Sequence, residues 1–221
     1  MKKVKLYNED FVDKDFSIKL KKRNVAIVIE GEEIYIEKFI FPKVKDHNIY
    51  DLVKNELICK FGSIHNIIFD YNLIYKGEDC VTTIVYCINI ENFNFLQKEN
   101  YCGAIITKID ILQNYFKKYF SSFIKEKEYY LAFRYKRTLY YLAVWNNNIV
   151  ANKVVNIEKT QINYTEELIK FISSIEEELY RTNKIYTIDL TLTNTELKNF
   201  IVVKLKDLNI KAFLQYMILK G

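Results

Sequence analysis

Apolar and polar residues follow two regular patterns in the first third of the chain. Residues 25–29 form a short β-branched run and residues 33–39 alternate charged with apolar side chains, so both predict strands. Gly31 lies between them and tolerates a positive φ, and we therefore predict a hairpin. Pro42, the only proline in the chain, lacks an N–H and ends the second strand near Phe41.

The pattern then changes to helical spacing. Asn48 is placed to cap a helix that ends at Gly62. One face of this helix carries the apolar residues Ile49, Leu52, Val53, Leu57 and Phe61. Residues 67–75 and 81–88 predict a second strand pair around the turn at residues 76–79, whose composition favours chain reversal. The predicted order is strand, strand, helix, strand, strand.

A short helix and another strand are predicted next, at residues 90–100 and 102–108. Asp110 is then placed to cap a further helix. The apolar face of that helix consists of Leu112, Tyr115, Phe116, Tyr119 and Phe120.

Charge replaces periodicity at residues 125–127, which predicts a first domain over residues 1–125 and a second over residues 126–221. The second opens with three β-rich runs that predict an antiparallel meander, at residues 129–133, 139–145 and 149–155. Asn163 and Glu166 have capping-box spacing, and the long helix that they start has an apolar face of Leu168, Phe171, Ile172, Ile175 and Leu179. A strand, a helix and a last strand complete the prediction, at residues 185–192, 195–208 and 210–214.

The composition is that of a globular protein. The chain has 221 residues, of which 50% are hydrophobic and 15% aromatic, enough for one compact domain or two small ones. No uninterrupted apolar run approaches the roughly 20 residues that span a bilayer. The N-terminal sequence lacks the apolar segment and small-residue cleavage site of a signal peptide. We therefore expect a cytoplasmic protein.

Neither a metal site nor a catalytic centre is expected. The cysteines have no C-x-x-C spacing and no nearby histidine, and they are best interpreted as reduced thiols packed as small apolar groups: Cys59, Cys80, Cys87 and Cys102. The histidines, His47 and His65, do not lie in serine or cysteine motifs, and the acidic pair Glu32-Glu33 is typical of a solvated face. We therefore name no catalytic and no metal-binding residue.

The formal net charge of +5 is spread along the chain, with one basic cluster of Lys19, Lys21, Lys22 and Arg23. A lysine-guarded strand edge explains this cluster best, while acidic lipid, nucleic acid or an acidic partner are the functional alternatives. A nucleic-acid-binding module is a rival hypothesis, because basic and aromatic side chains supply charge and stacking. Acidic residues interleaved with the lysines argue against it, so we expect no nucleic-acid partner.

Three sequence words come in a specific order. They are the apolar-Pro-Lys step at residues 41–44, the acidic Glu56 near the middle of the helix, and the Asp-Tyr pair in Phe69-Asp70-Tyr71. This succession resembles the inserted subdomain of the actin-like PilM family of type IV pilus assembly proteins, which is related to the cytoplasmic part of the secretion protein GspL. The resemblance implies an α+β fold of partial actin-like (ribonuclease H-like) architecture. It would combine a small inserted β-β-α-β-β subdomain with a second subdomain, a β-meander followed by α-β-α-β.

Actin-like enzymes hold ATP with two phosphate loops, each with an Asp and a Gly, and with a Leu-x-Gly-Gly step beside the adenosine. The second-phosphate position here is residues 133–138 (Phe-Arg-Tyr-Lys-Arg-Thr), where Thr138 is the single remnant. The adenosine step is residues 190–194 (Leu-Thr-Leu-Thr-Asn), and residues 1–24 contain no glycine for the first loop. Because backbone amides approach phosphates closely only where a Cβ is absent, we expect that ATP binding is lost and that there is no cofactor. An active actin-like ATPase would need the missing loops.

The turn at residues 133–138 also carries Arg134, Lys136 and Arg137. Three cations near one turn attract phosphate, and the alternative interpretation is a solvent-exposed hairpin tip. The sequence favours the solvent-exposed hairpin tip.

The resemblance implies a non-enzymatic scaffold at the inner face of the cell membrane. Such a protein docks the short cytoplasmic tail of a bitopic PilN-like membrane protein and contacts the pilus motor ATPase. An extended tail adds to an exposed strand edge or fills an apolar groove. The sequence does not identify the residues that bind the partner.

Overall fold

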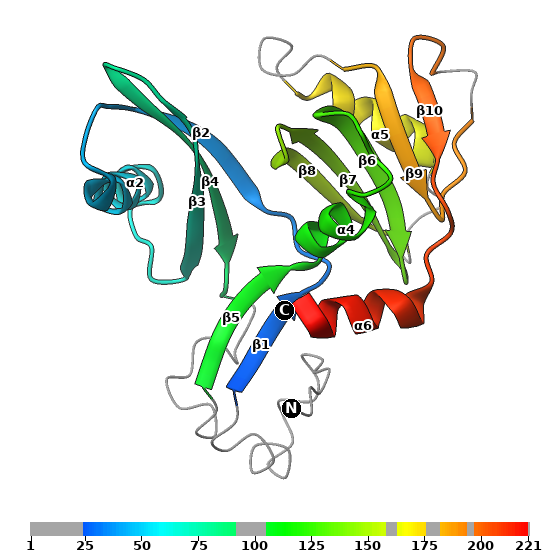
Figure 1. Cartoon of the computed structure of the whole chain (residues 1–221), viewed down its shortest axis with the longest axis horizontal. Helices are drawn as coiled ribbons and strands as arrows, with labels where there is room; N and C mark the ends of the chain where they lie inside the picture. The colour runs from blue at the N-terminus through cyan, green and yellow to red at the C-terminus, as the bar shows by residue number, and fades with distance from the viewer. Residues whose placement is uncertain (1–23, 92–104, 158–162, 176–181, 194–196, 221) are drawn as a thin grey trace. The chain divides into compact units, whose positions relative to one another are not determined.

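The computed structural model describes residues 24–91, 105–157, 163–175, 182–193 and 197–220 (Figure 1). They form two compact units, the first comprising Tyr35–Asp110 with the segment that ends at Val28, the second Ile29–Ile34 with Ile111–Lys220. The boundary predicted at residues 125–127 falls inside the second unit, since the helix that follows Ile111 packs on that unit's sheet. The basic cluster of residues 19–23 and Cys102 lie outside the described residues.

The first unit contains a three-stranded antiparallel sheet in the order β2-β4-β3. Its elements are β2 (Tyr35–Pro42), α2 (Asp46–Phe61), β3 (Ile67–Lys76) and β4 (Cys80–Asn89). The predicted β3-β4 pair is confirmed, and its turn closes with a 2.8 Å hydrogen bond from the Gly77 N–H to the Cys80 carbonyl. β2 ends at Pro42, as predicted.

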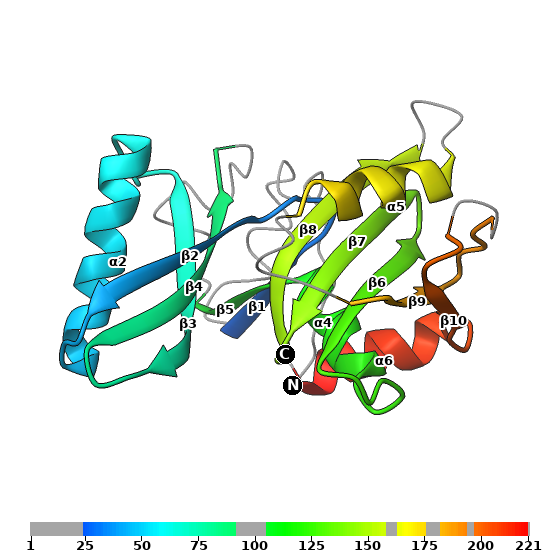
Figure 2. The ribbon, with the colours of Figure 1, turned by 90° about the horizontal axis from the view of Figure 1, so that it is seen from above.

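Helix α2 covers one face of this sheet (Figure 2). Its buried residues are Ile49, Val53 and Leu57, which pack with Phe41, Val81, Val85 and Cys87. The predicted apolar face is therefore confirmed for these residues, although Phe61 at the end of the helix is 39% exposed. Gly62 ends α2 with a φ of 73°, and its N–H donates to the Ile58 carbonyl at 2.8 Å.

The hairpin predicted at Gly31 is wrong. β1 (Asn24–Ile29) pairs with β5 (Ile105–Ile111), and β2 pairs with β4. The Gly31 N–H donates to the Tyr140 hydroxyl at 2.8 Å, so its turn serves a contact far away in the sequence and does not close a local hairpin.

Two of the three predicted helix caps are wrong. The N-cap of α2 is Lys45, without a side-chain cap, and Asn48 lies within the first turn. Asp110 lies in β5, 3.3 Å from Lys108, and α4 (Leu112–Phe120) begins after Ile111. The third is confirmed: the Asn163 side chain accepts from the Thr165 and Glu166 N–H groups at the start of α5 (Tyr164–Ser173).

The second unit contains a five-stranded sheet in the order β10-β9-β6-β7-β8 (Figure 1). Its strands are β6 (Glu128–Tyr135), β7 (Thr138–Trp145), β8 (Asn148–Asn156), β9 (Lys184–Ile188) and β10 (Ile201–Lys204). The predicted antiparallel meander β6-β7-β8 is confirmed. β9 lies parallel to β6, and β10 lies parallel to β9.

The last two predicted elements, a helix at residues 195–208 and a strand at residues 210–214, are wrong where the structure describes them. The β-branched Ile201, Val202 and Val203 form β10 beside β9. The segment that follows forms α6 (Ile210–Lys220), because its apolar residues have helical spacing and bury Phe213 and Met217.

Helices cover both faces of the five-stranded sheet (Figure 2). On one face, α5 packs Leu168 and Phe171 against a cluster that includes Tyr141 and Ile185. On the other, α4 and α6 bring aromatic rings together, with Phe116 stacked on the sheet's Phe133 at 3.9 Å between ring centroids. The predicted apolar faces of α4 and α5 are confirmed for Leu112, Tyr115, Phe116, Phe120, Leu168 and Phe171.

The remaining observations concern the ends of the predicted helices, metal binding and membrane spans. α5 ends at Ser173, before Ile175, and Leu179 lies outside the described residues, as does most of the helix predicted at residues 90–100. Within the described ranges, no group of three or more His, Cys, Asp or Glu side chains could hold a metal ion. Among the same residues, no helix has both the length and the apolar character needed to cross a membrane.

Candidate functional site at the β6–β7 turn

A two-residue turn, Lys136-Arg137, joins β6 to β7 at the predicted second-phosphate position. Tyr135 pairs with Thr138 across it. Lys136 has a φ of 54°, in the left-handed region that Gly, Asn and Asp occupy most easily. The turn therefore places a long cationic side chain where a small residue is sterically favoured.

Lys136 contacts an acid that is distant in sequence. Its Nζ lies 2.5 Å from Glu30 Oε2 and 5.2 Å from the centroid of the Tyr135 ring. The side chains of Lys136 and Glu30 are 42% and 23% exposed, so the pair is partly shielded from solvent. The cation at the turn is thus engaged by a carboxylate of the same chain.

Glu30 belongs to the segment Ile29–Ile34, which we call the strap. The chain bends at Gly31, whose φ is 81° and whose N–H donates to the Tyr140 hydroxyl at 2.8 Å. Burial raises the pKa of Tyr140 far above its usual value, so its hydroxyl remains protonated. Ile29 and Ile34, at the two ends of the strap, are both buried.

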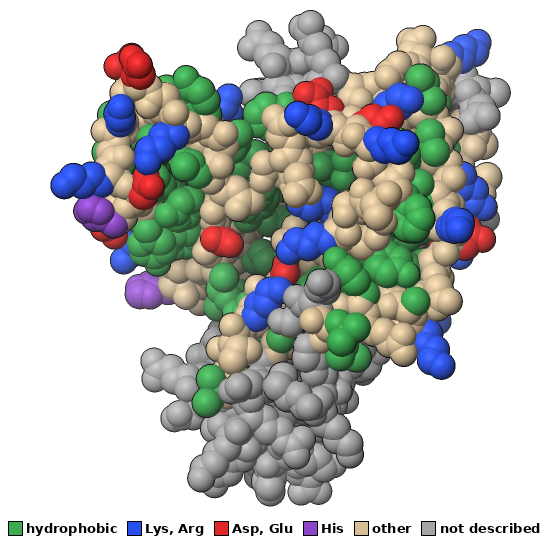
Figure 3. All heavy atoms as spheres, viewed as in Figure 1, with side chains coloured by type: hydrophobic (Ala, Val, Ile, Leu, Met, Phe, Trp, Pro, Cys, Tyr) green, Lys and Arg blue, Asp and Glu red, His purple; other side chains and the backbone are tan. Residues whose placement is uncertain are grey.

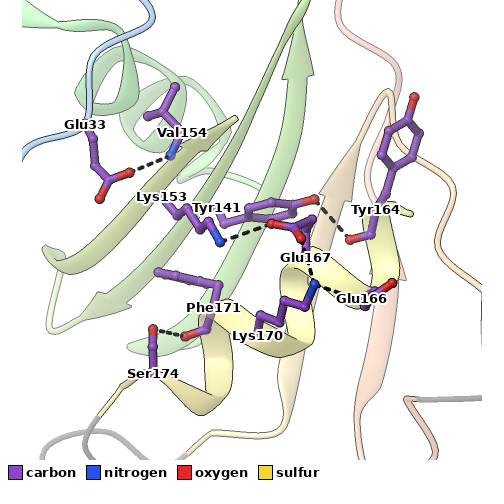
Figure 4. Close-up of polar contacts among 10 residues, drawn as sticks. All are labelled: Glu33, Tyr141, Lys153, Val154, Tyr164, Glu166, Glu167, Lys170, Phe171 and Ser174. Atoms are coloured by element: carbon purple, nitrogen blue, oxygen red, sulfur yellow. Dashed lines mark hydrogen bonds and ion pairs between the residues drawn. The ribbon is translucent and has the colours of Figure 1, made fainter. Parts of the chain in front are cut away.

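The second half of the strap is bound to β8 and α4. The Asn152 side chain accepts from the Ile34 N–H at 2.9 Å and donates to the Ile34 carbonyl at 2.6 Å. Glu33 accepts from the Val154 N–H at 3.3 Å (Figure 4), and Gln113 donates to the Glu32 carbonyl at 2.7 Å. Every residue from 30 to 34 therefore has a polar contact within the second unit.

Ion pairs fix α5 to β8 beside the β8 residues that bind the strap (Figure 4). Lys153, between Asn152 and Val154, lies 3.1 Å from Glu167, and Lys170 lies 3.2 Å from the same carboxylate. The hydrogen bond from Lys153 is the main cause that lowers the pKa of Glu167. The edge strand that binds the strap is thereby tied to the helix behind it.

The predicted adenosine step is also occupied by protein contacts. The Thr193 N–H donates to the Thr165 hydroxyl at 2.9 Å, and the two hydroxyls are 2.9 Å apart. Thr165 is buried in the first turn of α5, and Leu190 is buried as well, while Asn194 lies outside the described residues. A backbone amide that could have approached a ligand instead binds a hydroxyl of the chain.

The structure brings only some of the predicted residues together. Lys136 and Thr138 lie at the same turn, Arg134 is exposed beside it, and the Arg137 carbonyl accepts from the Ile157 N–H at 2.9 Å. Sequence reasoning missed Glu30 as the partner of Lys136. The available signal was a Glu-Gly step between two strand patterns, which we assigned to a local hairpin. Chemically, this turn can hold a carboxylate or another oxyanion.

Comparisons with known proteins rest on structure, because no protein-family model matches the chain and no curated protein matches its sequence. The PilM-PilN type IV pilus biogenesis complex is similar with a TM-score of 0.52 and 10% identity, over 85% of this chain and 70% of that chain. The cytoplasmic domain of EpsL, an inner membrane component of the type II secretion system of Vibrio cholerae, has a TM-score of 0.52 and 9% identity, over 94% of this chain and 79% of that chain. The chain has a PilM-like fold.

This PilM-like fold confirms the partial actin-like architecture that the resemblance implied. Because the sequence identities are only 10% and 9%, the likeness concerns the fold alone. A protein of unknown function with an actin-like ATPase fold from Bacteroides thetaiotaomicron is also similar, with a TM-score of 0.46 and 17% identity, over 96% of this chain and 79% of that chain. The similarity to PilM and EpsL extends over most of the chain, and not only over the first unit, where the sequence words lie.

Proposed function

We propose that this PilM-like protein is a non-enzymatic scaffold of a type IV pilus or a related secretion machine, on the cytoplasmic side of the inner membrane. Its fold likeness to PilM in complex with PilN and to the cytoplasmic domain of EpsL is the observation that carries this proposal. By their descriptions, one belongs to type IV pilus biogenesis and the other to a type II secretion system, so a structural role in such a system is the simplest shared one.

The absence of enzymatic activity is proposed from the two nucleotide positions. At the turn, Lys136 is engaged by Glu30, and at the adenosine step the Thr193 N–H is engaged by Thr165. A nucleotide would have to displace these contacts and approach side chains where actin-like enzymes have glycine. We therefore propose that the protein works without ATP and without another cofactor.

The partner that we propose is the N-terminal cytoplasmic tail of a bitopic membrane protein, docked on the three-stranded sheet of the first unit. α2 covers one face of this sheet. On the other face, Ile40 of β2 and Tyr75 of β3 are the two cross-strand neighbours of Thr82 in β4, and they are 62% and 57% exposed. Apolar side chains reach the surface over this unit in Figure 3. β2 and β3 are both edge strands, so an extended tail can pair with the backbone of an edge strand and contact the apolar side chains beside it. A contact with the motor ATPase is a further part of the proposal.

The test uses a peptide with the N-terminal cytoplasmic sequence of a bitopic membrane protein encoded beside this chain. Titration calorimetry should give saturable binding to the wild-type protein. Ile40→Asp should weaken that binding about tenfold, because it puts a charge into the proposed apolar surface. Ile58→Asp is the matched control on the outer side of α2, where Ile58 is 38% exposed, and it should bind as the wild type does. Equal weakening by both substitutions, or no binding at all, contradicts the proposal.

A further inference from the structure

The left-handed backbone at Lys136 is a feature that the scaffold function does not require. A side chain with a Cβ is sterically disfavoured there, and two-residue hairpin turns favour Gly, Asn or Asp at such positions. Backbone strain of this kind persists where surrounding contacts compensate for it. The contacts of the Lys136 side chain are therefore the ones that offset this strain.

Those contacts include one ion pair and one aromatic ring. The ammonium group meets the Glu30 carboxylate at 2.5 Å and lies 5.2 Å from the centroid of the Tyr135 ring. Hydrogen bonds between ionised partners are among the stronger ones, and an aromatic ring further stabilises the cation. The exposed Arg134 and Arg137 add positive charge within two residues of Lys136.

The strap delivers Glu30 to this site by its own backbone geometry. Gly31, one of five glycines in the chain, takes a φ of 81°, and its N–H is held by the hydroxyl of the buried Tyr140. The preceding residue, Ile29, is 3% exposed, so Glu30 lies between two anchored residues. The carboxylate is therefore positioned by the strap, unlike that of an isolated surface ion pair.

We propose that the β6–β7 turn is an oxyanion site whose resident ligand is the Glu30 carboxylate, and that inorganic phosphates bind there once this carboxylate is removed. The inference rests on the proposed function in one respect, namely that the turn holds no nucleotide in the wild-type protein. It goes further by naming the internal group that occupies the site and the class of ligand, carboxylate or phosphate, that the site accepts.

Titration calorimetry with inorganic pyrophosphate tests this directly. Glu30→Gln should bind pyrophosphate about tenfold more tightly than the wild type, and added salt should weaken the binding. Glu33→Gln is the matched control, because it removes the same charge from the strap while its amide oxygen can still accept from the Val154 N–H. It should bind as weakly as the wild type. Adding Lys136→Met to Glu30→Gln should abolish the gain. Equal affinities for Glu30→Gln and Glu33→Gln overturn the proposal.

A second measurement uses hydrogen exchange and does not depend on the Glu30 variant. Lys136→Met should speed exchange of the Gly31 and Ile34 amides about tenfold, because the strap loses one of its contacts. Arg134→Met, which removes a cation from the same hairpin, should leave both rates unchanged. Unchanged exchange in Lys136→Met overturns the proposal. Failure of the wild-type protein to bind the tail peptide would count against the proposed function alone, since neither measurement here involves that peptide.

Discussion

The two units bury their sheets in different ways. In the second unit, β7 has buried residues at six consecutive positions, because helices cover both faces of the sheet. In the first unit, the central strand β4 is buried at five consecutive positions as well, residues 81–85, and the edge strand β2 exposes alternate residues such as Ile40. A strand that is buried on both faces serves packing alone, whereas exposed apolar residues on an edge strand can also bind a partner. The comparison therefore supports the proposed partner site on the edge strands of the first unit.

The largest expected effect is in the core of the second unit. Phe133 is stacked between Phe116 at 3.9 Å and Tyr140 at 4.8 Å, so Phe133→Ala removes a ring from a closed aromatic stack. We expect a loss of about 3–5 kcal/mol of unfolding free energy, measured by urea denaturation. Phe123→Ala is the control, because Phe123 is 53% exposed, and it should cost less than about 0.5 kcal/mol. Equal losses would refute the assigned core.

A smaller and more local effect is expected in the first unit. Leu57 is fully buried between α2 and its sheet, so Leu57→Ala should cost about 2–4 kcal/mol. Hydrogen exchange should show lost protection in α2 and β4 and unchanged protection in β6 and β7. Ile58→Ala, on the neighbouring and more exposed position, should change little. Equal loss of protection in both units would contradict the expected local effect.

The sequence predicted the second unit's meander better than its connections, for a physical reason. Continuous apolar runs identify β6 and β7 because these strands are buried on both faces, while the edge strand β8 has one buried residue, Ile149. The ends of helices depend on contacts that periodicity does not record, so Asn48 and Asp110 were assigned as caps while Asn163 alone has that role. Short β-branched runs such as residues 201–203 are ambiguous until their pairing with β9 is known.

One part of the candidate site could be predicted from the sequence and the other part could not. The cations of the β6–β7 turn and the missing glycines are visible in the sequence. Their partner is not, because Glu30 and Lys136 are 106 residues apart and meet only through the fold. Gly31 was interpreted as a local turn, since a positive φ indicates a bend without indicating which distant group the bent backbone contacts.

Helix caps give a third, smaller contrast between the units. α5 is capped by the Asn163 side chain and α2 has no side-chain cap at Lys45. Asn163→Ala should therefore cost about 1 kcal/mol, and Lys45→Ser should add about 0.5 kcal/mol or more. Urea denaturation measures both. A loss on Lys45→Ser would show that the lysine makes a contact more valuable than a cap.

The smallest expected effect is a change in how the free energy of unfolding depends on pH in acid. Lys153 lowers the pKa of Glu167 in the folded protein below 4.5, so the ionised carboxylate stabilises the second unit above that pH. This contribution is lost as the pH falls from about 4.5 through the folded-state pKa. Glu167→Gln should flatten the decline of unfolding free energy in that range, in urea titrations at successive pH values. Glu78→Gln, in the exposed β3–β4 turn, should leave the decline unchanged.

The most direct test of the scaffold is a calorimetric titration of the wild-type protein with the membrane protein's tail peptide, in the absence and in the presence of Mg-ATP. We predict saturable binding with the same affinity in both conditions and no heat from Mg-ATP alone, because the groups at the turn and at the adenosine step are already engaged within the chain. Saturable Mg-ATP binding, or a peptide that fails to bind in either condition, would contradict the account.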